Sequence, residues 1–414
     1  MNSRRRPSTR TRRALLRAGA AALGTGLATS TAGCLSGLPP LGQRQTYGRI
    51  EAPAADDPAY RRFLPAPSTL GLGRDHHRLV AAAPGPVTGG EPEEFLGRRA
   101  FLRSDLDYFG VGYERYDRAL DCDLGTVVEA EFDPASVADV ILRSGYERDG
   151  THRGFALFSR ADVPRRVAVG DGALAWASRR VHDAPDVEAL VDAGVGERRR
   201  YHESSPGFDR LGRAAGTGRQ VVVAPGFGDP TDAATLGADC FRFDDDAAYQ
   251  VVTLLFPPDR VPSRDRLERG FRDEAGLTSE ADTFDVSVDG RLATLEARVP
   301  LRGRRDLTPM DEPPQVTWGA SFDPDARTVE LRHEAGESVD AEWLHYNVSG
   351  PDATGGLDPR PLFESTRSVG PGDAATVDLR DRPDATEVQV VLAPEECCAF
   401  DVLFEYDLEG RGAE

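Results

Sequence analysis

The chain has 414 residues and a formal net charge of −19, and its length favours two domains because a single core rarely grows beyond about 300 residues. All 50 basic residues are Arg, which excludes a P-loop lysine, a Schiff base with pyridoxal phosphate and a Ser-x-x-Lys nucleophile. The acidic balance also excludes a nucleic-acid partner, since phosphate contacts need a basic surface.

Residues 1–33 hold seven Arg and no acidic residue, so the chain beyond them carries −26 instead of −19. A weakly apolar stretch from Ala14 to Ala32 follows the Arg-rich start, and it is too short and too mild for a stable membrane helix. The pair Arg12 and Arg13 is followed by Ala14, then by two leucines and a further Arg, as in the twin-arginine export motif that this segment resembles.

Thr31-Ala32-Gly33-Cys34 closes this segment and resembles a lipobox, in which the Cys thiol receives diacylglycerol. Two acyl chains on Cys34 would hold a protein firmly to a membrane. The order of the two motifs predicts a lipoprotein anchored through Cys34 on the extracytoplasmic face of the cell membrane. Residues 34–58 are rich in Pro, Gly and Ala and are expected to form a tether.

The acids are scattered along the whole chain rather than gathered in one tract. Together with the absence of Lys, this composition resembles that of proteins from salt-loving archaea. In molar salt the Debye length is about 3 Å, so a dense carboxylate surface repels itself little. The alternative is an acidic face that binds cations or a basic partner.

Residues 59–301 mix strand and helix patterns, which predicts an α+β domain. A strand is expected at 126–132, and Asp133-Pro134 favours a helix start with Pro in its first position. The spacing of Val137, Val140 and Ile141 gives this helix one apolar face, and Gly145 ends it. Strands at 154–159 and 166–169 and a helix at 185–193 are expected next.

A second segment repeats this order. It has a strand at 251–256, Pro257-Pro258, and two strands at 283–288 and 291–299 joined by Asp289-Gly290, a strong hairpin signal. The repetition suggests two ferredoxin-like halves packed as a pseudo-dimer. The alternative is an ordinary α+β domain with a coincidental similarity.

Residues 302–314 are charged and Pro-bearing and are expected to form a linker. Beyond them the helix signals stop, and residues 315–408 contain short strands separated by Gly, Pro and Asp turns. Strands are expected at 316–322, 328–333, 343–348, 375–379, 387–392 and 399–406. This pattern is typical of an Ig-like β-sandwich.

Residues 329–344 carry a second resemblance. Their order of strand, His333, Gly336, acid, apolar residue, Asp340-Ala341 and Leu344 is similar to a stretch of the sandwich domain of archaeal type IV pilins. The resemblance implies an Ig-like accessory fold. It does not extend to the N-terminus, where this chain has a lipobox instead of a prepilin cleavage site.

Four further cysteines are candidates for oxidation outside the cell. Cys122 and Cys240 precede the strands of the two repeated segments, so a bridge between them is one expectation and two buried thiols are the other. Cys397 and Cys398 are adjacent and would form only a strained disulfide. Asn347-Val348-Ser349 matches the N-glycosylation acceptor pattern.

The sequence offers no metal or cofactor site that exceeds an ordinary structural interpretation. His76 and His77 are neighbours on an extended segment and would point to opposite sides, so a solvated loop is expected there. The run 244–246 contains three Asp but lacks the spacing and closing Glu of a calcium loop. No cofactor, metal or catalytic residue is therefore predicted.

Two functions remain as hypotheses. The preferred one is a non-enzymatic envelope lipoprotein that binds or scaffolds another surface component. The alternative is an anchored enzyme or solute-binding protein with a site between the α+β halves, lined by residues such as Glu129, Tyr146 and Arg153.

Overall fold

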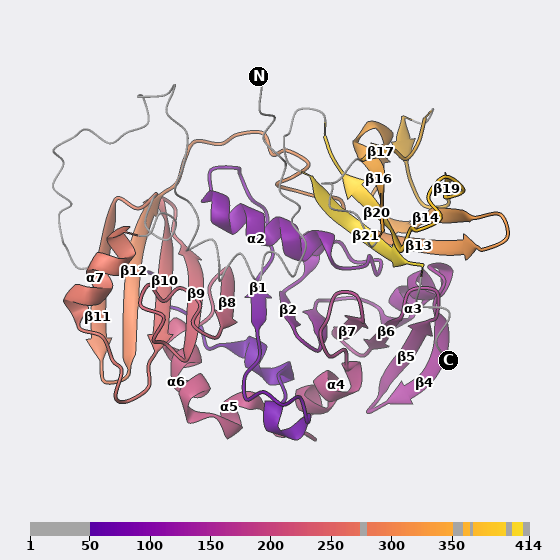
Figure 1. The fold of residues 1–414 in the computed structure, drawn as a ribbon. Helices are drawn as coiled ribbons and strands as arrows, with labels where there is room; N and C mark the ends of the chain where they lie inside the picture. Colours follow the sequence, from indigo (N-terminus) through magenta and orange to yellow (C-terminus); the bar gives the residue numbers. More distant parts are fainter. Residues whose placement is uncertain (1–49, 274–279, 351–358, 365–366, 395–399, 409–414) are drawn as a thin grey trace.

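The computed structural model describes residues 50–273, 280–350, 359–364, 367–394 and 400–408. The predicted export motif with Arg12 and Arg13, the predicted lipid attachment site Cys34 and the pair Cys397 and Cys398 lie outside the described residues. Figure 1 shows a large sheet flanked by helices and, above one end of it, an all-β part. No helix within the described ranges is long and apolar enough to cross a membrane.

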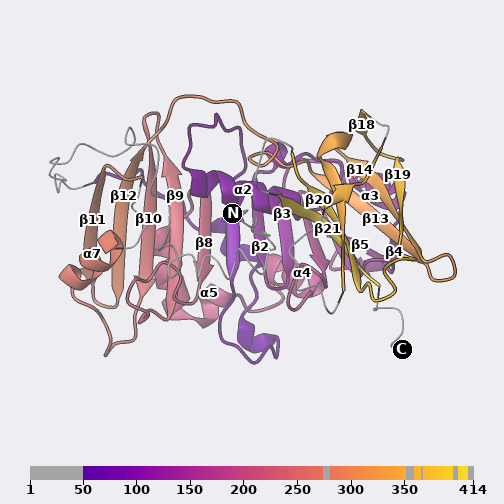
Figure 2. The same cartoon turned by 45° about the horizontal axis from the view of Figure 1, so that its top comes forward.

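One sheet of twelve strands dominates the structure, in the order β11-β12-β10-β9-β8-β1-β2-β3-β7-β6-β5-β4 (Figure 2). Two of its inner strands, β7 and β10, are buried along their whole length. Burial on both faces explains why these segments read as continuous apolar runs rather than as alternating patterns. The strands are β1 (Leu79–Ala82), β2 (Arg118–Cys122), β3 (Gly125–Glu129), β4 (Glu147–His152), β5 (Phe155–Arg160), β6 (Arg165–Val169), β7 (Ala173–Ser178), β8 (Gln220–Ala224), β9 (Leu236–Phe243), β10 (Ala247–Leu255), β11 (Thr283–Asp289) and β12 (Leu292–Pro300).

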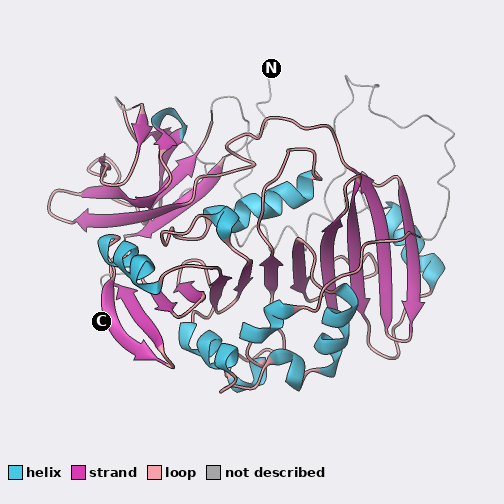
Figure 3. Ribbon diagram, turned by 180° about the vertical axis from the view of Figure 1, so that it is seen from behind, coloured by secondary structure: helices cyan, strands magenta, loops and turns pink. Residues whose placement is uncertain are grey.

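Helices cover both faces of this sheet (Figure 3). Val128 of β3 shares a hydrophobic cluster with Leu102 and Ile141 on one face, whereas its neighbour Val127 packs in the cluster of Leu190 and Leu211 on the other. Successive strand residues point to opposite faces of the sheet, so two neighbouring apolar residues in a strand pack against the helices on both faces. The first face carries α2 (Glu93–Ser104), α3 (Pro134–Arg143) and α7 (Arg264–Asp273), and the second carries α4 (Val187–Val195), α5 (Tyr201–Ser204) and α6 (Pro206–Ala215).

The local signals at α3 and at the β11–β12 hairpin are confirmed. The Asp133 carboxylate accepts hydrogen bonds from the backbone N–H groups of Ala135 and Ser136, and Pro134 occupies the first turn. Gly290 has φ 59°, the left-handed conformation that a tight hairpin needs and that Gly adopts without strain. Both features depend on residues close in sequence, which is why pattern reasoning found them.

The second segment has the predicted order of strand, helix, strand and strand, whereas four strands follow the helix in the first segment. In each, a strand is followed by a helix on the same face and then by strands that return to pair with the first: β3, α3 and β4–β7, then β10, α7 and β11–β12. All pairings described in this sheet are antiparallel, and the segments join edge to edge through β1 and β8. The structure therefore does not support separate ferredoxin-like halves packed as a pseudo-dimer.

The C-terminal part is all-β apart from a short 3-10 turn, in the residues that the structure describes. Two sheets, β13-β14-β19 and β17-β16-β20-β21, contribute to one shared hydrophobic core that contains Trp318, Leu331, Val390 and Tyr406. The strands are β13 (Val316–Asp323), β14 (Thr328–Gly336), β15 (Val339–Asp340), β16 (Leu344–Ser349), β17 (Arg360–Pro361), β18 (Ser368–Val369), β19 (Ala374–Asp378), β20 (Glu387–Leu392) and β21 (Asp401–Asp407).

The turn between β5 and β6 fastens this all-β part to the large sheet. Val163 projects from the turn into the core of the all-β part, where it is 2% exposed. Arg160 donates hydrogen bonds to Glu334 of β14 on one side of it. Elsewhere in the junction, the Gln315 amide donates to the hydroxyl of Tyr116 at 2.8 Å. The two parts therefore pack as one body.

Replacing Val163 by alanine is expected to lower the free energy of unfolding by about 2 kcal/mol, because two buried methyl groups are lost and a cavity remains. Val288 of β11 is 38% exposed, so Val288→Ala provides the matched control and should change stability by less than about 0.5 kcal/mol. Chemical denaturation in high salt measures both variants. Equal effects of the two substitutions would show that the turn does not anchor the junction.

Candidate functional site

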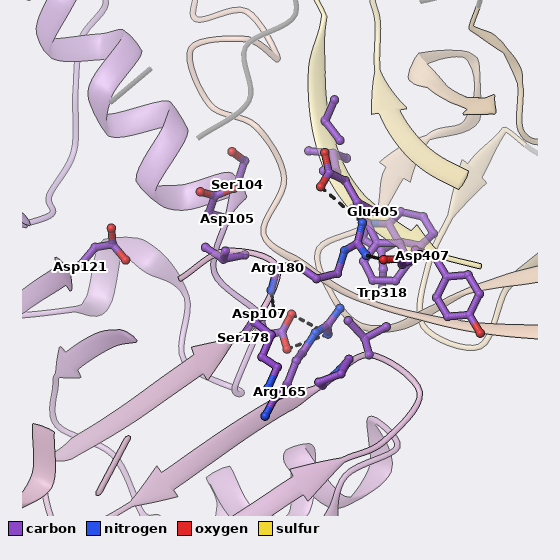
Figure 4. A pocket seen from close by; sticks show the side chains of 18 of the residues that line it. Ser104, Asp105, Asp107, Asp121, Arg165, Ser178, Arg180, Trp318, Glu405 and Asp407 are labelled. Atoms are coloured by element: carbon purple, nitrogen blue, oxygen red, sulfur yellow. Dashed lines mark hydrogen bonds and ion pairs between the residues drawn. The ribbon is translucent and has the colours of Figure 1, made fainter. Parts of the chain in front are cut away.

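The main cavity of the described structure lies at the junction between the large sheet and the all-β part, and its volume is about 760 Å³. Its walls come from the end of α2, the ends of β2 and β7, the β5–β6 turn and strand β21 (Figure 4). The charged residues that line it are Arg78, Asp105, Asp107, Asp121, Asp123, Asp162, Arg165, Arg179, Arg180, Asp183, Glu387, Glu405 and Asp407.

The lining is strongly acidic. Nine carboxylates face four guanidinium groups, which leaves a formal charge of five negative. Some of these carboxylates are neutralised by Arg residues behind the wall, such as Asp162 by Arg160 and Asp123 by Arg74. The dielectric constant is lower in a partly enclosed site, so the remaining negative charge interacts more strongly with other charges there than it would on an open surface.

Three carboxylates, those of Glu387, Glu405 and Asp407, lie together in the wall formed by the all-β part. The Arg180 guanidinium lies 3.1 Å from Glu387, 3.6 Å from Glu405 and 3.7 Å from Asp407 (Figure 4). The Gln389 amide donates to both glutamates, at 2.6 Å and 3.3 Å. Burial and the charge of Glu405 raise the pKa of Glu387 above its ordinary value, although Arg180 opposes the shift. This wall therefore holds negative charge that Arg180 only partly balances.

A buried ion pair forms the floor of the cavity. Nη1 of Arg165 lies 2.9 Å from both carboxylate oxygens of Asp107, and the Tyr146 hydroxyl donates to the same carboxylate at 2.6 Å. The Trp176 indole N–H donates to that hydroxyl at 3.3 Å. Desolvation raises the pKa of Tyr146 well above its ordinary value, so the phenol stays neutral.

Two N–H groups in the wall lack acceptors. Trp318 lines the cavity, its side chain is 1% exposed, and its indole nitrogen has no hydrogen-bond partner. Nε of Arg180 is likewise buried without a partner. Buried donors are normally satisfied, so these two are exceptions, and both nitrogen atoms are covered by protein rather than open to the cavity.

A Ser, a His and an Asp meet beside the cavity without forming a catalytic triad. Nδ1 of His182 lies 3.1 Å from the backbone nitrogen of Ser178, and Nε2 lies 3.2 Å from the Asp121 carboxylate. Both ring nitrogens thus have partners other than the serine hydroxyl, which accepts from the backbone N–H of Arg180. The geometry does not activate Ser178 as a nucleophile.

The residues proposed for a site between the α+β halves do not converge. Tyr146 lies under the junction cavity, as described above. Glu129 pairs with Arg118 at 2.8 Å, and Arg153 is exposed and pairs with Asp192 at 3.2 Å. The best-formed site lies instead between the large sheet and the all-β part, where distant segments meet.

The predicted Cys122–Cys240 bridge is excluded by the sheet order. Cys122 lies on β2 and Cys240 on β9, with β1 and β8 between them. Three strand spacings put their backbones about 14 Å apart, whereas a disulfide needs Cα atoms within about 7 Å. Burial raises the pKa of Cys122 to about 12 and that of Cys240 to about 11, so both stay as unreactive thiols.

Asn347 lies on β16 and is 7% exposed. Its side-chain nitrogen donates to the Gln389 carbonyl oxygen at 3.1 Å, across the pair β16–β20. An acceptor nitrogen buried in a sheet is out of reach of a glycosylating enzyme once the protein has folded. The fold therefore argues against modification of the folded chain at this position.

The metal candidates have structural roles. His77 is fully buried rather than solvated, and its Nε2 lies 2.9 Å from the Pro65 carbonyl oxygen. Asp244 closes a turn, because its carboxylate accepts from the backbone of Asp246 and Ala247 and from the Tyr249 hydroxyl. Within the described residues, no group of three or more His, Cys, Asp or Glu could hold a metal ion.

Replacing Glu387 by glutamine is expected to stabilise the protein by up to about 1 kcal/mol at pH 7. A carboxyl group whose pKa is raised on folding costs stability as the pH rises through that pKa, and an amide removes this cost. Below pH 4, where both forms are neutral, the advantage should vanish. Thermal unfolding of the wild type and of Glu387→Gln at pH 7 and below pH 4 measures this difference in stability. The exposed substitution Glu342→Gln is the control. A loss of stability at pH 7 would contradict the prediction.

No family model matches the chain, and no curated protein sequence matches it. Among solved structures, it is similar to two crystal forms of a protein named TP0453, at 12% identity in each case. The alignments cover 57% of this chain and 92% and 94% of TP0453, with TM-scores of 0.37 and 0.35. Similarity this low carries no inference about function.

Proposed function

We propose that this protein is a lipid-anchored extracytoplasmic binding protein, and that its ligand occupies the junction cavity. The proposed location is supported by the resemblance to a twin-arginine motif and by the lipobox-like segment that ends at Cys34. The cavity supports the binding role: its volume of about 760 Å³ falls in the range of about 300–1,000 Å³ typical of small-molecule sites.

The observation that carries the proposal is that both parts of the chain build the cavity and are fixed to each other. Arg160 and Glu334 are nearly buried where they pair across the junction, and Val163 fills the core of the all-β part. A site whose walls are held in place before the ligand arrives spends little binding energy on ordering them.

The all-β part would then serve binding rather than filament assembly. Residues 329–344, which resemble the pilin sandwich, form β14, β15 and the turn that leads to β16. We propose an Ig-like accessory domain whose strand β21 supplies a wall of the site, with Glu405 and Asp407 facing the ligand.

Mass spectrometry of the N-terminal peptide from membranes tests the address. A peptide that begins at Cys34 and carries the mass of a diacylglyceryl group is expected. A peptide that begins upstream of Cys34 without added lipid would overturn the anchoring proposal.

Thermal unfolding of the purified protein with a small-molecule library, in molar salt, tests the binding role. A ligand that raises the midpoint is expected, and Leu403→Trp should reduce the effect because it places a bulkier side chain in the wall of the cavity. Leu142 on α3 is 47% exposed and outside the cavity, so Leu142→Trp is the matched control. Ligands that stabilise both tryptophan variants equally would place binding elsewhere.

A further inference from the structure

A second cavity, of about 500 Å³, adjoins the junction cavity, because Arg179 and Asp183 line both. Its walls come from the loop before β1, the turn between β2 and β3, and the segment that leads from β7 into α4. The binding role proposed for the junction cavity does not involve it. Its lining combines apolar side chains with a few polar ones, and the two kinds together decide what it binds.

Leucines form much of the apolar lining. Leu124, in the turn between β2 and β3, is buried, whereas Leu70 and Leu72 are half-buried and pack against the same core. Gly71 between them has φ 67°, a left-handed turn that Gly makes without strain, and both leucines beside it line the cavity. An alkyl group placed against these leucines would remove apolar surface from water, which is favourable.

Three of the polar residues in this lining are already engaged. His182 is buried, and its two ring nitrogens have the partners described above. Asp183 lies 3.7 Å from the Arg74 guanidinium, and Asp186 caps the first turn of α4. A ligand would have to break an existing contact to use any of these groups.

Arg179 is the exception. It is exposed, and its guanidinium has no ion-pair or hydrogen-bond partner among the residues that the structure describes. A guanidinium only donates, and its planar N–H groups match the two oxygens of a carboxylate. An exposed ion pair contributes little on its own, so an anion at Arg179 needs an apolar group on the leucines to bind firmly.

We propose that the second cavity binds a small carboxylate with an alkyl chain, with the carboxylate at Arg179 and the chain against Leu70, Leu72 and Leu124. This site is additional to the one proposed in the junction cavity, and it does not depend on the acidic lining there. The ion pair is a direct contact, so it persists in molar salt, where a Debye length of about 3 Å removes mainly the longer-range attraction.

Three matched probes test the ligand class by calorimetry in molar potassium chloride. Octanoate has the charge and the chain, octanamide has the chain without the charge, and butyrate has the charge on a shorter chain. Octanoate is expected to bind about fivefold more tightly than octanamide and about tenfold more tightly than butyrate. Octanamide binding as tightly as octanoate would overturn the ion pair, and butyrate binding as tightly would overturn the apolar contact. No measurable binding of octanoate would overturn the site.

Two substitutions assign the contacts. Arg179→Gln should bring octanoate binding down to that of octanamide, whereas Arg148→Gln, at an exposed position on β4, should not. Leu72→Ser should weaken octanoate binding about fivefold, with exposed Leu142→Ser on α3 as its control. Circular dichroism confirms that each variant is folded. An unchanged octanoate affinity in folded Arg179→Gln or Leu72→Ser refutes the assignment.

The two binding proposals fail separately. Leu403 lines the junction cavity and not the second one, so Leu403→Trp should leave octanoate binding unchanged. If Leu403→Trp weakens octanoate binding and Leu72→Ser does not, octanoate lies in the junction cavity and the second site is refuted. If octanoate depends on Arg179 and Leu72 while no library ligand responds to Leu403→Trp, the second site stands and the junction site fails.

Discussion

Replacing Arg98 by methionine is expected to lower the free energy of unfolding by about 3–5 kcal/mol at pH 7. Arg98 of α2 is 8% exposed and donates at 2.6 Å to the Asp239 carboxylate on β9, which is 0% exposed. The Gln250 amide also donates to Asp239, but it brings no charge. Methionine keeps most of the volume and leaves a buried carboxylate without its cation.

The effect should depend on pH with a definite sign. Burial raises the pKa of Asp239 above its ordinary value, and Arg98 works against that shift. Removing Arg98 raises this pKa further, so the variant loses stability as the pH rises from about 4 through the folded-state pKa. The difference from the wild type should therefore be larger at pH 7 than at pH 4.5.

An exposed pair of similar geometry is the control. Arg213 of α6 pairs with Asp209 one turn earlier and is 62% exposed. Arg213→Met should cost less than about 1 kcal/mol, because surface ion pairs contribute little. Replacing Arg98 and Asp239 together by apolar residues should recover most of the loss, and a double variant as unstable as Arg98→Met would contradict the explanation.

Replacing Arg165 by methionine is expected to cost a similar amount, about 3–5 kcal/mol, and to loosen the floor of the cavity. Arg165 and Asp107 are 5% and 7% exposed, and the guanidinium also packs 5.3 Å from the centre of the Phe404 ring on β21. The substitution therefore removes the charge partner of Asp107 and a contact between the two parts of the chain.

The neighbouring residue supplies the matched control. Arg166 is 42% exposed and pairs with the exposed carboxylates of Asp149 and Glu188. Arg166→Met should change the free energy of unfolding by less than about 1 kcal/mol. Denaturant unfolding of both variants measures the difference, and comparable losses would show that burial of the Arg165 pair is not what stabilises the junction.

Local signals predicted a substantial part of the fold. The Asp133 cap of α3, the Gly290 hairpin and the change to an all-β C-terminal part all depend on residues close in sequence, and all are present. Six strands of the large sheet were not anticipated, namely β1, β2, β4, β7, β8 and β9. For example, β4 is polar and exposed over most of its length, and β7 follows a Gly-rich turn. Pairing with neighbours, rather than their own pattern, makes them strands.

The candidate site was not predictable in the same way. Arg180 and Glu387 are 207 residues apart and meet only because β21 and β20 pack over the end of β7. In a chain where acids are scattered everywhere, no spacing distinguishes Glu405 or Asp407 from any other surface carboxylate. Only their position around a cavity does.

The sequence alone determined the acidic character and the type of many elements, because these depend on composition and on short-range order, and its N-terminal motifs predict a lipid-anchored location. Tertiary structure decided which strands pair: the order of the strands rules out the Cys122–Cys240 bridge and does not support separate ferredoxin-like halves. It also decided which charges are buried together at the junction. Long-range pairing and burial depend on the whole chain packing at once, so they leave no local pattern to detect.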